Sequence, residues 1–265
     1  LSIDFQDLEM YSLITQVEAM SDNGTVVMKQ PDKQYSTILQ RNELNSLVET
    51  LTKSDLISFD LETTSVKSLE AEIVGLSFSV QAHEGYYIPI VYPEKEIKPG
   101  IQIDTVLNAL KPIFENEENR FCGQNIKFDA LVLCNYDIMI ANICFDTMIA
   151  EYMLHPEKNS YKLDYLSLDY LKYRMIPIDD LIGTGLHQKS MAEVALDDIA
   201  FYACEDADVA FQLTEILENK LKKEKLFQPY IAIENPLIQV LISIEKNGVF
   251  LNIDLLKDLS QQFGE

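Results

Sequence analysis

The chain has 265 residues, 47% of them hydrophobic, which is enough for one large α/β domain with a buried core and flanking segments. Its 43 acidic and 21 basic residues give a formal net charge of −22, which argues against a general nucleic-acid-binding surface. The four cysteines form no C-x-x-C pair and no apolar run approaches the ~20 residues that span a bilayer, so no zinc site, disulfide framework or membrane span is indicated. We expect a monomeric cytoplasmic protein with reduced thiols.

The two ends of the chain differ from its middle. Residues 1–34 are polar and mixed, and we interpret them as a linker or the tail of a preceding domain. The sequence begins at Leu1 rather than at methionine and stops within a charged, helix-like stretch at Glu265. We therefore expect a fragment of a longer protein, with its main domain over residues 35–225 and a separate segment over residues 226–265.

The first half of the main domain alternates between helical and strand patterns. Hydrophobic periodicity predicts helices over 42–51 and 103–114, and strands over 56–61, 73–80, 86–90 and 120–125. A turn at residues 83–85 joins two of these strands, which indicates an antiparallel meander. The sequence therefore predicts an α/β fold with a mixed sheet.

The second half of the main domain is mostly helical. Helical spacing predicts helices over 128–133, 146–154 and 163–171, then a glycine-bearing loop over 177–188 and a long helix over 196–223. Beyond it, Pro229 and Pro236 indicate a linker, and a further amphipathic helix is expected from about Leu237.

Asp60 and Glu62 stand two residues apart at the end of a predicted strand. Alternation along a strand puts both carboxylates on one face, with Phe59 and Leu61 on the other. Two like charges this close repel each other unless a cation lies between them, so a shared metal ion is one interpretation. The alternative is a pair of solvated acids at a strand end.

Asp206 lies in the long predicted helix, whose apolar stripe places it on the side that should pack against the sheet. A buried carboxylate is costly unless it is paired, protonated or bound to a metal. Tyr202 lies one turn earlier and is therefore its neighbour. The alternative is a buried acid held by a local hydrogen bond, with Tyr202 as an ordinary core residue.

Asp129 follows the predicted strand over 120–125 and lies at the start of a helix. It could simply interact with the helix dipole, or it could be a fourth acid at the carboxyl edge of the sheet, where α/β folds place ligands. Sites rich in carboxylate oxygens suit hard cations such as Mg²⁺ or Mn²⁺.

Three segments that carry these residues resemble the three motifs of the proofreading exonuclease domain of bacterial DNA polymerase I, in the tyrosine branch of the DEDD superfamily. They are residues 59–63 (FDLET), 123–129 (GQNIKFD) and 202–208 (YACEDAD). Supporting segments are residues 73–78 (IVGLSF), 87–89 (YIP) and 145–148 (FDTM), and the resemblance covers about residues 35–225. Residues 235–251 resemble the start of the polymerase module, and residues 8–13 resemble the region that follows a 5′-nuclease portion.

The resemblance implies a ribonuclease H-like fold, with a mixed sheet of five to six strands, and two Mg²⁺ or Mn²⁺ ions. Asp60 would bridge both ions, Glu62 and Asp206 would complete the tighter site, and Asp129 would hold the second ion. Tyr202 would orient the attacking water together with Glu62. Thr63 and Asn125 match positions that contact the terminal nucleotide.

The resemblance also implies a function: hydrolysis of single-stranded DNA from its 3′ end to nucleoside 5′-monophosphates, proofreading for the polymerase module of the parent chain. This fragment is not expected to synthesise DNA. Three alternatives stay open: an RNA-processing exonuclease of the same superfamily, a catalytically silent scaffold of a polymerase, and an acidic domain that binds cations without hydrolysis.

Overall fold

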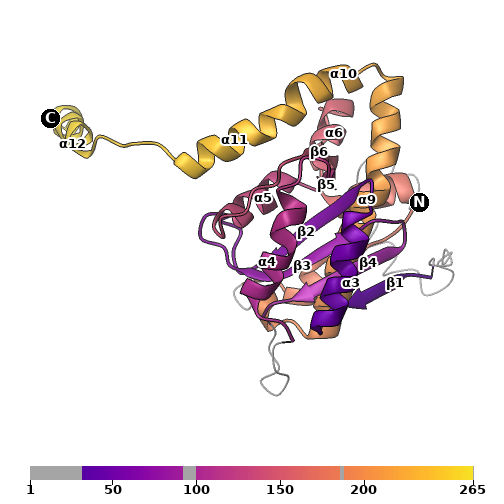
Figure 1. The fold of residues 1–265 in the computed structure, drawn as a ribbon. Helices are drawn as coiled ribbons and strands as arrows, with labels where there is room; N and C mark the ends of the chain where they lie inside the picture. Colours follow the sequence, from indigo (N-terminus) through magenta and orange to yellow (C-terminus); the bar gives the residue numbers. More distant parts are fainter. Residues whose placement is uncertain (1–31, 92–99, 186–187, 265) are drawn as a thin grey trace.

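A six-stranded mixed sheet forms the centre of the structure, a computed structural model that describes residues 32–91, 100–185 and 188–264 (Figure 1). The strand order is β1-β4-β3-β2-β5-β6, and β3 alone runs antiparallel to its two neighbours. The expected mixed sheet with its antiparallel meander, β2-β3-β4, is thus confirmed. The strands are β1 Gln34–Thr37, β2 Ile57–Thr63, β3 Ile73–Ser79, β4 Glu84–Pro89, β5 Phe121–Gly123 and β6 Ile143–Asp146.

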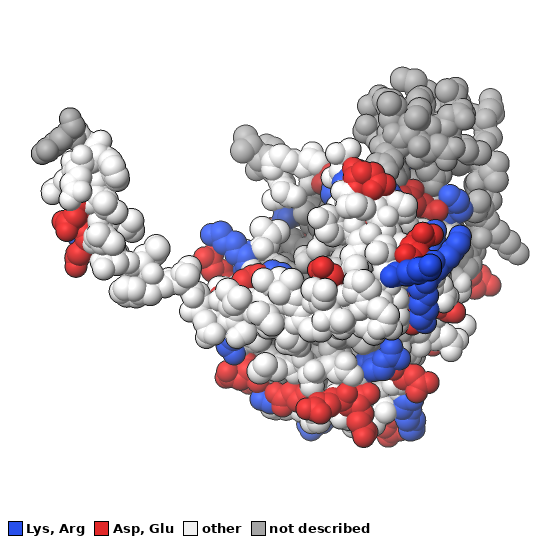
Figure 2. All heavy atoms as spheres, turned by 90° about the horizontal axis from the view of Figure 1, so that it is seen from above, with Lys and Arg blue, Asp and Glu red and all other residues white. Residues whose placement is uncertain are grey.

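Helices cover both faces of the sheet (Figure 1). The helices α3, α4 and α5 pack on one face and the long helix α9 packs on the other. Figure 2 shows one side of the molecule, on which acidic and basic side chains lie interspersed. The helices are α3 Arg41–Thr52, α4 Ile103–Phe114, α5 Ile126–Cys134, α6 Thr147–Leu154, α7 Leu163–Leu166, α8 Ile178–Ile182, α9 Leu196–Lys223, α10 Phe227–Pro229, α11 Asn235–Asn247 and α12 Ile253–Gly264.

The alternation along β2 separates a core face from a polar face. Phe59 and Leu61 join the apolar core beneath α3, α4 and α5. There the Phe59 ring lies 5.3 Å from Phe78 and 4.9 Å from Phe114, measured between centroids. Asp60 and Glu62 consequently face α9, as strand geometry predicts.

Helix α9 closes the opposite face of the sheet with a continuous apolar stripe. Its first half packs on β3 and β4 through Ile199, Ala203 and Cys204, and its second half packs around Leu213 and Leu217. The helix begins and ends where the sequence predicts, because one apolar face is maintained over its 28 residues.

Several predicted elements differ from the structure. Strand β4 begins at Glu84, so the predicted turn at 83–85 lies partly within a strand, and the predicted loop at 177–188 contains the short helix α8. Strand β5 is shorter than the predicted 120–125. The strands β1 and β6 were not predicted, because four residues are too few to show a period. The segment 1–31 lies outside the described residues.

The predicted linker around Pro229 and Pro236 is wrong. Residues 227–247 are helical throughout, as α10, a π-helical turn at Tyr230–Glu234 and α11. Pro229 lies in the first turn of α10, where the missing N–H costs no hydrogen bond, and Pro236 lies in the first turn of α11, directly after the π-helical turn. Buried Tyr230, Ile238 and Ile242 pack this segment on the domain, whereas α12 has no buried residue. Among the described residues, no helix is long and apolar enough to cross a membrane.

Candidate active site

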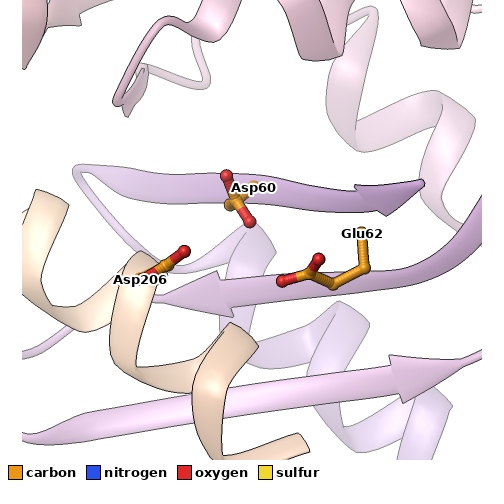
Figure 3. Close-up of side chains that lie close together, drawn as sticks. All are labelled: Asp60, Glu62 and Asp206. Atoms are coloured by element: carbon orange, nitrogen blue, oxygen red, sulfur yellow. The ribbon is translucent and has the colours of Figure 1, made fainter. Parts of the chain in front are cut away.

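Three carboxylates meet between β2 and α9, as Figure 3 shows. Asp60 and Glu62 project from the strand and Asp206 from the helix, and one oxygen from each lies within 4.8 Å of the other two. Glu62 is 6% exposed, while Asp60 and Asp206 are half-buried. The structure thus brings together three of the acids that the sequence singles out.

Burial and mutual repulsion make these acids hard to ionise. Burial raises the pKa of Asp60 to about 7. Burial and then the charges of Asp60 and Asp129 raise the pKa of Glu62, and burial followed by Asp60 and Glu62 raises that of Asp206. A divalent cation bound by these oxygens would remove the repulsion and favour the charged forms.

The donors suit such an ion. All three side chains offer carboxylate oxygens, the ligand type that hard cations prefer. The Oε1 atom of Glu62 is buried and has no hydrogen-bond partner among the described residues. The acidic cluster can therefore bind a divalent metal ion.

Asp129 lies on the first turn of α5, beside the same cluster. Its carboxylate is 3% exposed and accepts a hydrogen bond from the Leu61 N–H at 3.2 Å. Burial and then Asp60 raise its pKa, while hydrogen bonds from the backbone oppose the change. Asp129 interacts electrostatically with Asp60 and Glu62 but is not one of the three acids whose oxygens lie within 4.8 Å.

Tyr202 lies one turn before Asp206 on α9 and faces the acids. Its hydroxyl forms a hydrogen bond that lowers the pKa of Asp206. Burial, then Asp206, Glu62 and Asp60, raise the pKa of Tyr202. The hydroxyl consequently keeps its proton at neutral pH and can donate a hydrogen bond at the edge of the cluster.

An open cavity of about 460 Å³ adjoins the acids. Asp60, Asp129 and Asn125 line one part of it, and residues 159–162 line another. The side chain of Gln124 ties these parts together, since its amide donates to the Tyr161 carbonyl at 2.7 Å. The sequence does not predict the part that the loop at 159–162 plays in this cavity, because the loop has neither hydrophobic periodicity nor a motif.

The two predicted nucleotide contacts have different positions. Asn125 lines the cavity and adopts a left-handed backbone conformation, with φ of 53°, immediately before α5. Thr63 does not line the cavity, and its hydroxyl donates to the Ser65 carbonyl at 3.0 Å. The register of the β2–β3 pairing shifts between Glu62 and Thr63, which is the last residue of β2.

Asp146 supports the site by holding the starts of α5 and α6, a role that the sequence does not predict. Its Oδ1 caps α6 by accepting from Met148 N–H at 2.9 Å and Ile149 N–H at 3.1 Å. Its Oδ2 accepts from the Ile126 N–H at 2.9 Å, at the first residue of α5. Burial raises the pKa of Asp146 to about 6, although these hydrogen bonds favour the ionised form. Asp146 thereby fixes the start of the helix that carries Asp129.

The chain is similar in sequence to known proteins. A protein-family model described as "3'-5' exonuclease" matches residues 35–222. The chain is 33% identical over 257 residues to DNA polymerase I of Pseudomonas aeruginosa, covering 96% of this chain and 28% of that protein. It is 35% identical over 223 residues to DNA polymerase I of Borreliella burgdorferi, covering 84% of this chain and 24% of that protein. The chain therefore spans about a quarter of the length of these relatives.

Solved structures share the fold. The POL domain of Pol1 from M. smegmatis, in complex with a DNA primer-template and dNTP, aligns with a TM-score of 0.66 and 16% identity, over 86% of this chain and 35% of that one. The catalytic core of RRP6 from Trypanosoma brucei aligns with a TM-score of 0.59 and 14% identity, over 81% of this chain and 53% of that one. At these identities the similarity concerns the fold.

Proposed function

The chain belongs to the 3′–5′ exonuclease domain family of DNA polymerase I, and from that membership we propose that it removes nucleotides from the 3′ end of single-stranded DNA. Each cycle hydrolyses the last phosphodiester and releases a nucleoside 5′-monophosphate. The observation that carries the proposal is the cluster of Asp60, Glu62 and Asp206 beside an open cavity. Repelling carboxylates in that position favour a metal ion facing a phosphate.

Asp60, Glu62 and Asp206 would hold one divalent ion, and Asp60 with Asp129 would hold a second, each Mg²⁺ or Mn²⁺. When bound, the two ions supply the Lewis acidity for an in-line displacement at phosphorus. The closeness of the three carboxylate oxygens, and the burial of Asp129 next to Asp60, support this assignment.

The remaining residues orient the reactants. Tyr202 keeps its proton and donates a hydrogen bond, so together with Glu62 it can orient the attacking water. Asn125 and the neighbouring Phe128 line the cavity that would receive the terminal nucleotide. Thr63 does not line this cavity, so its contact with the nucleotide stays a prediction from the sequence. Recognition by stacking and backbone contacts makes the reaction insensitive to base identity.

We further propose that this activity proofreads for a polymerase module in a longer parent chain. Two facts support the proposal: the similarity to DNA polymerase I extends beyond the exonuclease match at residue 222, and the chain covers about a quarter of those relatives. With a net charge of −22, the chain alone should bind DNA weakly, so most of the affinity would come from the polymerase module.

The proposal is tested with a single-stranded DNA oligonucleotide labelled at its 3′ end, incubated with Mg²⁺ or Mn²⁺ and with EDTA. We expect metal-dependent release of the labelled mononucleotide, and much slower release from an RNA of the same sequence. The matched control is Glu215→Ala, which removes an exposed acid from the same helix as Asp206 and should leave the rate unchanged. Metal binding without hydrolysis would overturn the proposal. Faster cleavage of RNA than of DNA would make RNA, not DNA, the substrate.

A further inference from the structure

A glycine faces Glu62 across the sheet. In the antiparallel pair of β2 and β3, Glu62 lies opposite Gly75, just as Asp60 lies opposite Ser77. Side chains of directly opposed residues share one face of a sheet, with Cβ atoms about 4.5–5.5 Å apart. Glycine weakens the interior of a strand and often marks the close approach of another group. The space next to Glu62 on this face is thus left open by Gly75.

Tyr87 fills that space. It lies on β4, opposite Ser77, and is completely buried. A Cβ atom added to Gly75 would lie 2.2 Å from the Tyr87 Oη atom and 2.3 Å from its Cζ atom. The hydroxyl end of Tyr87 therefore occupies the position that a side chain at residue 75 would take, on the face that carries Glu62.

Both neighbours carry an unused polar atom. Tyr87 Oη and Glu62 Oε1 are buried, and neither has a hydrogen-bond partner among the described residues. A buried polar group left unpaired destabilises the folded state. Such an atom is rare in a native core, and two of them around Gly75 on one face of the sheet call for an explanation.

The chemistry of the two groups fixes which of them is the donor. A tyrosine hydroxyl, with an ordinary pKa of about 10, carries its proton at neutral pH, and a carboxylate oxygen can only accept. A protonated hydroxyl next to a carboxylate is a strong, charge-assisted pair.

We propose that Tyr87 is a positioning residue, whose hydroxyl donates to one oxygen of Glu62 and thereby aims the other oxygen at the metal ion. Tyr87 lies between the sheet and α9, packed near Ala203 and Cys204, and does not line the cavity. Tyr202, by contrast, lies on α9 and forms its hydrogen bond with Asp206. The inference rests on the proposed function only in that Glu62 is a metal ligand.

The direct test is Tyr87→Phe, which removes the hydroxyl and keeps the ring over Gly75. We expect Mn²⁺ affinity, measured by calorimetry without DNA, to fall about tenfold, the size seen when a partner of a metal ligand is lost. The kcat of hydrolysis should fall with it, while the KM for DNA and the melting temperature stay near those of the wild type. The matched control is Tyr86→Phe, the adjacent tyrosine on the opposite face of β4, which should change none of these values.

A double-mutant cycle tests whether Tyr87 acts through Glu62. In a Glu62→Gln background, Tyr87→Phe should produce little further loss of Mn²⁺ affinity. An equal loss in both backgrounds, or Mn²⁺ affinity of Tyr87→Phe within twofold of the wild type, would overturn the inference.

A second variant covers the case in which Tyr87→Phe does not fold. Gly75→Ala retains the hydroxyl but displaces it, because the new Cβ atom would collide with the ring. It should weaken Mn²⁺ binding in the same way, and unchanged binding would contradict the inference. Binding is measured without DNA, so the two proposals can fail separately. Mn²⁺ binding that depends on Tyr87 but yields no hydrolysis would contradict the proposed function and leave the inference about Tyr87 standing.

Discussion

Replacing Asp60 with asparagine should stabilise the metal-free protein at neutral pH while it removes the activity. Burial raises the pKa of Asp60 from 3.8 to about 7, so the folded state holds a proton that the unfolded chain has already released. For a carboxyl group with a raised pKa, stability is lost as the pH rises from about 4 to about 7. Asparagine has the same shape and carries no charge, so this loss should disappear.

The size of the effect follows from the change in pKa. Since one pKa unit is worth about 1.4 kcal/mol, the difference between 3.8 and about 7 corresponds to roughly 4 kcal/mol. Asp60 is half-buried, so solvent screening reduces this value, and we expect about 1–3 kcal/mol at pH 8. At roughly 2–4 °C per kcal/mol, the melting temperature of the variant should be about 2–12 °C higher.

The assay is thermal unfolding of the wild type and Asp60→Asn in EDTA between pH 4 and pH 8. The two melting temperatures should coincide near pH 4 and separate as the pH rises. Saturating Mn²⁺ should reverse the order, because the wild type alone binds the ion tightly. A variant that is less stable than the wild type at pH 8 in EDTA would refute the reasoning that burial raises the pKa of Asp60 in the metal-free protein.

Four further predictions follow from the site. Asp206→Ala should lower the rate of hydrolysis by more than about a hundredfold with its circular dichroism spectrum unchanged, and near-wild-type activity would show the ligand assignment to be wrong. Tyr202→Phe should lower kcat about tenfold to a hundredfold, because the attacking water would lose its orienting hydroxyl, and a kcat within twofold of the wild type would contradict this role. Asp146→Asn should lower the free energy of unfolding by about 1–3 kcal/mol in urea titrations, because one amide oxygen cannot accept all the hydrogen bonds made by two carboxylate oxygens, and unchanged stability would contradict this account. DNA binding by the isolated chain should be weak and should weaken further with salt in anisotropy titrations. A tight complex that resists salt would contradict this prediction.

Helices with a long, regular hydrophobic period could be predicted from the sequence. The helices α4 and α9 begin and end at their predicted residues, since each keeps one apolar stripe over several turns. The alternation of Phe59, Asp60, Leu61 and Glu62 likewise predicts which side chains face α9. Short elements such as β1 and β6 could not be predicted, because their pairing with β4 and β5 depends on the folded sheet.

The site was only partly predictable for a similar reason. The carboxylates stand out in the sequence as charges at apolar positions, and the structure brings Asp60, Glu62 and Asp206 together. The residues around them do not stand out, because only the folded structure brings them near the acids. The Tyr87 hydroxyl occupies the space left by Gly75, opposite Glu62, and Asp146 at the end of β6 accepts a hydrogen bond from the first residue of α5. No local pattern encodes either arrangement.

The most direct test of the central claim is to identify the product released from a single-stranded DNA by the wild type and by Asp206→Ala. We predict that the wild type with Mg²⁺ or Mn²⁺ releases nucleoside 5′-monophosphates one at a time from the 3′ end. EDTA or the substitution should stop the release. Hydrolysis that persists in EDTA, or products cut from within the strand, would contradict a metal-dependent 3′–5′ exonuclease.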